Sequence, residues 1–175
     1  MSTTTIEDQL AEFRGRVDRL QALAGAVAEN ARIQRHVDAL RRQEAAVLAA
    51  FREAPDEIEK NLGQLKTRLA VAERSLAADI SDDWATFAVA VEEELRSWDT
   101  YLERLQATAA TRAWKVREQA EAAIGDVRSR RIAVDERLAQ ARDAAGDACE
   151  EQRNRVTAAR DELEQKADEL STKLK

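Results

Sequence analysis

The stretch IEDQLAEFRGRVDRLQALAGAV, residues 6–27, decides the fold. Its apolar residues recur at alternating steps of four and three positions, and they are Ile6, Leu10, Phe13, Val17, Leu20, Ala24 and Val27. This spacing places them on one face of an α-helix, in the heptad-like pattern by which helices pack in bundles and coiled coils. The pattern predicts an amphipathic helix with a narrow apolar seam.

The seam resumes after a shift of one position near Asn30. Its later members are Ile33, Val37, Leu40, Val47 and Phe51. The spacing therefore predicts one first helix that runs to about Arg52. At 1.5 Å per residue, such a helix is roughly 70 Å long.

The segment FREAPDEIEKNL, residues 51–62, contains the only proline. Pro55 clashes with the preceding turn of a continuing helix but fits the first turn of a new one. We therefore expect a helix break near 54–56. A second seam follows, and its members are Ile58, Leu62, Leu65, Leu69, Ala72 and Leu76.

The segment AADISDDWATF, residues 77–87, predicts a weaker interruption at 79–82. Ser81 has the character of a helix cap, and Asp82 and Asp83 that of an acidic first turn. The apolar line nevertheless crosses this segment, and a continuous helix tolerates such a step as a stutter. We favour a break or a kink.

The chain from Trp84 onward continues the apolar line with few helix-breaking residues. Gly125 and Gly146 are the only further breakers, and an isolated glycine costs a helix about 1 kcal/mol. We expect one more break somewhere in 106–126. The sequence leaves open whether 82–175 forms one helix or two.

Together these patterns predict an all-α protein. The expected architecture is a single elongated domain over residues 1–175, an antiparallel helical bundle or coiled coil of three or four long helices. Charged residues make up 35% of the chain and aromatic residues only 4%. This mixture is typical of long helices rather than of a thick globular core.

The distribution of charge limits the classes of partner that the chain is expected to bind. The net charge is −6, from 28 basic and 34 acidic residues that are interspersed along the chain. A nucleic-acid-binding protein requires a basic face, so we expect no nucleic-acid partner. The chain shows no secretory signal, no internal disulfide and no apolar run of the roughly 20 residues that cross a bilayer. We expect a cytoplasmic location.

Residues that could perform catalysis are sparse. His36 is the only histidine, and Ile33 stands where a di-iron helical bundle requires a glutamate three residues before it. The chain contains no phosphate-binding loop, dinucleotide-binding glycine motif or nucleophile elbow. We expect no catalytic, cofactor-binding or metal-binding residue and no enzyme activity. His36 is interpreted as a surface side chain beside Val37 of the seam.

The only cysteine, Cys149, lies beside a line of seam alanines. An activated thiol requires a helix N-terminus or a nearby cation, and here two neighbouring glutamates oppose the charge of Arg153. We interpret Cys149 as a small apolar packing residue.

The aromatic residues are concentrated before about Trp114. Trp84 and Trp98 are two heptads apart, with Phe87 and Tyr101 near them. We expect these four residues to form one cluster in the core. Tryptophan and tyrosine are also enriched at binding hot spots, so the cluster is the candidate interface, and we expect self-association through it.

Two stretches carry a resemblance: SWDTYLERLQ, residues 97–106, and AAGDACEEQRNRVTAARDEL, residues 144–163. In these stretches the chain resembles a loosely defined set of bacterial coiled-coil proteins, some labelled stress-response or apolipoprotein-like. Cys149 stands where those relatives commonly carry a tryptophan. The resemblance covers about residues 84–170 and implies an elongated helical protein of stress or envelope physiology, without catalytic residues.

Two functions remain open. The first is a non-enzymatic interaction or scaffold protein that self-associates or docks another helical protein through its seams. The alternative is a helical protein that binds a lipid or membrane surface reversibly through its apolar stripes. The net acidity and the narrow seam favour the first and predict at most weak lipid binding.

Overall fold

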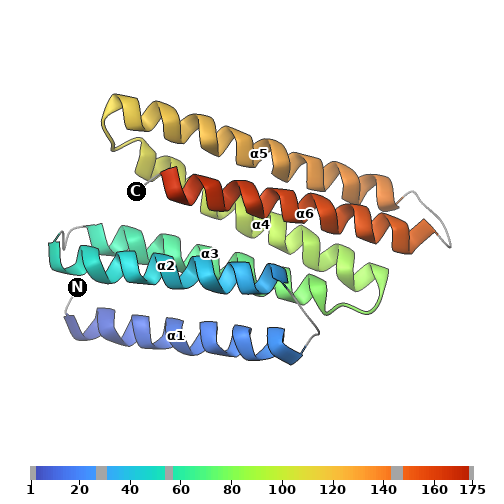
Figure 1. The fold of residues 1–175 in the computed structure, drawn as a ribbon, viewed down its shortest axis with the longest axis horizontal. Helices are drawn as coiled ribbons and strands as arrows, with labels where there is room; N and C mark the ends of the chain where they lie inside the picture. Colours follow the sequence, from blue (N-terminus) through green and yellow to red (C-terminus); the bar gives the residue numbers. More distant parts are fainter. Residues whose placement is uncertain (1–2, 27–30, 54–56, 143–147, 174–175) are drawn as a thin grey trace.

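The computed structural model describes residues 3–26, 31–53, 57–142 and 148–173, and within them the chain is all-α, as predicted. These residues form six helices, and consecutive helices run antiparallel (Figure 1). Their bounds are α1 Thr3–Ala26, α2 Ala31–Glu53, α3 Ile58–Asp79, α4 Trp84–Ala109, α5 Trp114–Arg142 and α6 Ala148–Lys173.

The expected three or four long helices are not observed. The predicted first helix to about Arg52 is wrong, because α1 ends at Ala26 and α2 begins at Ala31 and returns alongside it. The longest described helix is α5, whose 29 residues span about 44 Å rather than 70 Å. The one-position shift near Asn30 marks the division between α1 and α2, because each helix buries its own apolar face.

The other helix ends lie close to the expected breaks. The break near 54–56 falls between α2 and α3, although these three residues lie outside the described part of the chain. The break in 106–126 falls between Ala109 and Trp114. The described residues of 82–175 form three helices rather than one or two, since α5 and α6 are separate; Gly125 lies within α5.

In the turn between α3 and α4, the N-cap is a different residue from the one predicted. Asp83, not Ser81, is the N-cap of α4, and its carboxylate accepts hydrogen bonds from the backbone N–H of Thr86 at 2.9 Å and from its hydroxyl at 2.6 Å. The chain makes a further turn after Asp79, so the Ser81 hydroxyl donates backwards to the carbonyl of Ala77 at 2.7 Å. Ser81 therefore provides a hydrogen-bond donor for a free carbonyl at the C-terminal end of α3, and it does not cap the N-terminus of α4.

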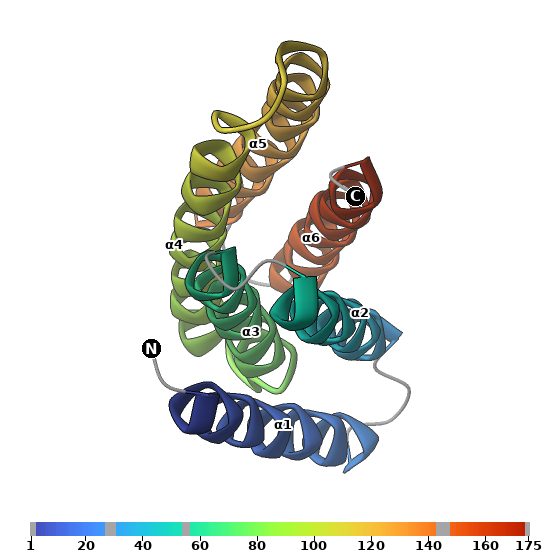
Figure 2. The same ribbon diagram turned by 90° about the vertical axis from the view of Figure 1, so that its left-hand side faces the viewer.

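The apolar side chains form two separate clusters. The N-terminal cluster lies between α1, α2 and α3, and its members include both predicted seams, from Ile6 to Ala24 and from Ile58 to Leu76. The C-terminal cluster lies between α4, α5 and α6, with Val71 and Ala78 of α3. Helix α3 thus contributes to both clusters and packs closely along α4 (Figure 2).

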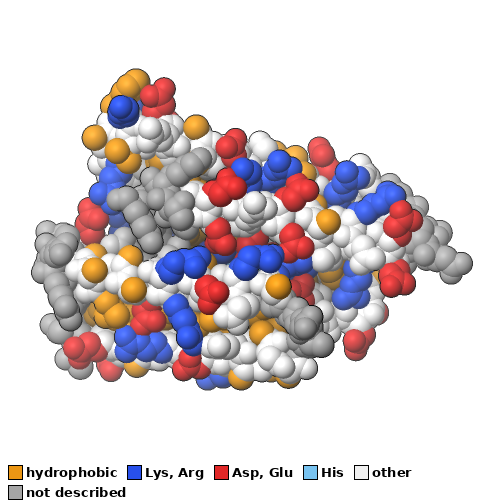
Figure 3. Space-filling model, in the orientation of Figure 1, with side chains coloured by type: hydrophobic (Ala, Val, Ile, Leu, Met, Phe, Trp, Pro, Cys, Tyr) orange, Lys and Arg blue, Asp and Glu red, His pale blue; other side chains and the backbone are white. Residues whose placement is uncertain are grey.

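Helix α6 is attached to the rest of the protein in two different ways. Its backbone lies close along α5, with which it forms a hairpin. Its approach to α2 is made through long polar side chains, whereas it meets α3 and α4 through such side chains and through the apolar residues of the C-terminal cluster. Basic and acidic side chains are mixed over the face seen in Figure 3 rather than gathered by sign. Within the described residues, no helix has the length and apolar character to cross a membrane.

Candidate functional site

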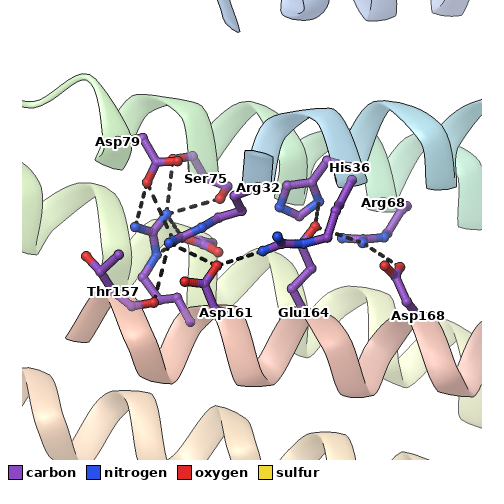
Figure 4. A network of polar contacts seen from close by, with 12 residues as sticks. Arg32, His36, Arg68, Ser75, Asp79, Thr157, Asp161, Glu164 and Asp168 are labelled. Carbon is purple, nitrogen blue, oxygen red and sulfur yellow. Dashed lines mark hydrogen bonds and ion pairs between the residues drawn. The ribbon is translucent and has the colours of Figure 1, made fainter. Parts of the chain in front are cut away.

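Four helices place polar side chains on faces that meet between the two apolar clusters (Figure 4). On α2, α3 and α6 most of these residues recur at steps of three, four or seven positions, which keeps them on one side of the helix. We call this set the polar layer, and its members are Arg32, Arg35, His36, Gln43, Arg68, Ser75, Asp79, Glu94, Arg160, Asp161, Glu164 and Asp168.

Arg160 joins α6 to both α3 and α4 at one end of the layer. Its guanidinium donates to Glu94 at 2.8 Å, to Asp79 at 2.8 Å, and to the hydroxyl and carbonyl oxygens of Ser75 at 3.0 and 3.1 Å. The side chain is only 1% exposed. Burial disfavours its charged form, but the charges of Glu94 and Asp79 outweigh this effect and raise the pKa of Arg160.

Glu164 lies towards the other end of the layer, with Arg68 and Asp168 beyond it (Figure 4). One carboxylate oxygen lies 3.3 Å from Nδ1 of His36 and 4.0 Å from Arg68, and the other lies 3.5 Å from Arg35. Burial raises the pKa of Glu164 to about 7, against the opposing effect of the nearby arginines. Burial and four surrounding arginines hold the pKa of His36 well below its usual value. Both shifts favour the neutral form of each side chain.

Arg32 connects the two ends. Its guanidinium lies 3.5 Å from Asp79 of α3 and 3.2 Å from Asp161 of α6, and it donates to the carbonyl of Thr157 at 3.4 Å. Asp161 also pairs with Arg35 at 2.7 Å, at the solvent-exposed rim of the layer. The layer is therefore continuous from Ser75 to the far turn of α6.

An aromatic pair forms the wall of the layer on α4. The Arg68 guanidinium lies 4.6 Å from the ring centre of Trp98 and 5.9 Å from that of Tyr101. Such a contact stabilises a buried cation through the electron-rich ring face. Gln43 of α2 donates to the Tyr101 hydroxyl at 2.7 Å. Burial raises the pKa of Tyr101, so its hydroxyl remains protonated at neutral pH.

The four residues of the candidate interface share the C-terminal cluster, in which Phe87, Trp98 and Tyr101 are members and Trp84 packs against them, and there they make two separate ring contacts. Trp98 and Tyr101 are an edge-to-face pair with ring centres 6.0 Å apart, while Trp84 contacts Phe87 at 5.6 Å, nearer the start of α4. Phe87, Trp98 and Tyr101 are buried by their own chain. They offer no surface to a second molecule in this structure, and only Trp84 is partly exposed.

The interpretation of His36 as a surface residue is wrong, since its side chain is fully buried. Helix α2 is covered on two sides: Ile33, Val37 and Leu40 face the N-terminal cluster, while His36 faces the polar layer. Polar residues recur at helical spacing on α2 and α6 alike, but the same spacing is typical of a solvated face. The side chain of Cys149 lies outside the described part of the chain, so its role stays a prediction.

The chemistry of the layer is charge compensation inside the protein. It brings together four arginines and five carboxylates from four helices, with one histidine among them. Within the described residues, no group of histidine, cysteine and carboxylate side chains has the arrangement of a metal site. Comparisons with protein families, with curated proteins and with solved structures find no match for this chain.

Proposed function

We propose that the chain is a non-enzymatic interaction protein that binds a helix of a partner protein on the face of α2 and α3 that α6 covers. The polar layer is the observation that carries this proposal. Almost any helix with an apolar stripe can pack against an apolar surface. A surface with buried charges binds only a helix that carries the matching charges.

The charges of the polar layer define which charged residues the partner helix must carry, and at what spacing. Glu94 and Asp79 require a base opposite them, which α6 supplies as Arg160. His36 and Arg68 require carboxylates one and two turns further on, supplied as Glu164 and Asp168. The partner helix is therefore one that carries a base followed by acids at the fourth and eighth positions.

The α5–α6 hairpin is the element that uncovers this face. Helix α6 turns its apolar residues, among them Val156, Leu163 and Leu170, into the C-terminal cluster with α5. A hairpin that swings away keeps the apolar contacts between α5 and α6, but it gives up the charged contacts of the layer and the apolar contacts with α4. Breaking buried ion pairs costs less when both partners regain water together than when one partner is left behind.

A peptide of residues 148–173 tests this function directly. The peptide carries a fluorescent label and is titrated with the full-length protein, with binding read from fluorescence anisotropy. We expect saturable binding, because the peptide presents the charges of α6. A control peptide with Arg160→Glu and Glu164→Arg has the same composition and should bind at least tenfold more weakly.

Two results would contradict the proposal: no binding at the highest protein concentration, or equal binding of both peptides. Sedimentation equilibrium of the protein alone identifies one class of partner. A dimer that dissociates on dilution and weakens when Arg160 is replaced would make a second copy of this chain the occupant.

Reversible lipid binding ranks second. The exposed large apolar side chains are spread over four helices and one turn, and they are Leu23, Leu48, Ile80, Val89, Trp114, Val116 and Ile132. The closed protein therefore presents separate apolar residues to a bilayer rather than a stripe. Strong co-sedimentation of the protein with vesicles at physiological salt would reverse this order.

A further inference from the structure

His36 and Glu164 meet across the α2–α6 contact, inside the protein. Their side chains are 1% and 2% exposed, and Nδ1 of His36 lies 3.3 Å from the Glu164 carboxylate. Within the described residues, neither ring nitrogen of His36 and neither carboxylate oxygen of Glu164 makes a hydrogen bond. A charge on either side chain is therefore poorly solvated. The free-energy cost of burying that charge depends on the other charges around it.

The surrounding charges balance without this pair. On α2, α3 and α6 the layer holds four bases, which are Arg32, Arg35, Arg68 and Arg160. Against them stand four acids from α3, α4 and α6, which are Asp79, Glu94, Asp161 and Asp168. Leaving out the rim pair of Arg35 and Asp161 gives three of each sign, so the balance is unchanged.

We propose that His36 and Glu164 share a single proton and so form a buried one-proton link that sets how firmly α6 is docked on α2. With one proton the pair is neutral and the layer carries no net charge. Without it the layer has one uncompensated negative charge, and with two protons it has one uncompensated positive charge. Either change leaves a buried charge that the layer does not compensate. This inference concerns the closed protein and does not rest on the proposed partner.

The direction of the pKa shifts locates the proton. The pKa of Glu164 is raised to about 7 and that of His36 is held well below its usual value of 6.5, so the folded protein keeps the proton on Glu164. In the open or unfolded chain, the proton resides on His36 between about pH 4.5 and 6.5. Folding thus moves one proton from His36 to Glu164 without a net change in protons bound.

This transfer gives a distinctive pH profile. Glu164 alone would favour unfolding as pH rises, because its folded pKa is raised; His36 alone would favour folding as pH rises, because its folded pKa is lowered. In the wild-type protein the two effects nearly cancel. We expect its unfolding constant to change only about twofold between pH 5 and pH 8.

Single substitutions separate the two effects. In His36→Gln, the unfolding constant should rise about 70-fold from pH 5 to pH 8, since only Glu164 titrates. In Glu164→Gln, it should instead fall over the same range, by up to about 30-fold, since only His36 titrates. The control is Glu162→Gln, an exposed carboxylate on α6, which should keep the flat wild-type profile. Urea unfolding at a series of pH values measures all four.

Nuclear magnetic resonance of the wild-type protein tests the proposal even where a variant fails to fold. His36 is the only histidine, so its imidazole signals are unambiguous. We expect a neutral ring at pH 6, with no titration near pH 6.5. A ring that titrates with a pKa near 6.5, or single variants whose pH profiles share one slope, would overturn the one-proton link.

Discussion

The Arg160 guanidinium of α6 donates to the Glu94 carboxylate of α4 at 2.8 Å, and both side chains are almost completely buried. Taking two charges out of water is costly, and the attraction between them largely offsets that cost. The pair therefore contributes little net stability while it is intact. It strongly penalises any arrangement in which α6 is out of register.

Arg160→Met should lower the free energy of unfolding at pH 7 by about 3–5 kcal/mol, because the buried Glu94 carboxylate loses its cation. The double variant Arg160→Met, Glu94→Met should regain most of this loss, since the Glu94 charge is gone and Asp79 keeps its contact with Arg32. Urea unfolding of the four proteins in the cycle measures the coupling. Arg155→Met, on the exposed side of α6, should stay within about 0.5 kcal/mol of wild type.

Equal losses in the single and double variants would show that Arg160 acts through packing of its chain rather than through its charge.

The three tryptophans should behave differently on substitution. Trp98→Ala removes a fully buried ring and should cost about 3–5 kcal/mol. Trp114→Ala removes a side chain that is 68% exposed and should stay within about 0.5 kcal/mol of wild type. Iodide quenching of single-tryptophan variants provides an independent check, with Trp98 protected and Trp114 accessible. Quenching of Trp98 as efficient as that of Trp114 would mean that the aromatic wall of the polar layer is open in solution.

The Asp83 cap should show a characteristic acid dependence. Hydrogen bonds from Thr86 lower the pKa of Asp83, so its stabilising effect is present above the ordinary aspartate pKa and is lost as pH falls through the lower folded value. Asp83→Ala should therefore unfold at lower urea than wild type at pH 7, with the difference shrinking at acidic pH. Asp82→Ala, the neighbouring exposed residue, serves as the control. A difference between Asp83→Ala and wild type that persists unchanged at pH 2 would exclude the ionised cap.

Local sequence patterns predicted what depends on local contacts. The seams through Ile6 and Ile58 lie in the N-terminal cluster. The same patterns gave wrong helix bounds where those bounds depend on which helices pack against each other. A heptad-like seam is compatible with one long helix or with two that return on each other, so α1 and α2 were predicted as one.

The polar layer was not predicted for a related reason. Arg35 and Asp161 lie 126 positions apart, and charged residues at helical spacing are the normal appearance of a solvated face. The helices α2 and α6 each carry such residues, and only their placement against each other turns both faces inward. His36 was misjudged for the same reason, because its neighbour Val37 marks only one of the two buried sides of α2.

We propose that the polar layer divides the fold, so that the α5–α6 hairpin opens while α1, α2 and α3 remain closed. Native-state hydrogen exchange, resolved by helix, measures this most directly. We predict a lower opening free energy for amides of α6 than for those of α3, and Arg160→Met should lower the value for α6 more than that for α3. A single opening free energy shared by α3 and α6, in the wild type and in Arg160→Met alike, would contradict the account.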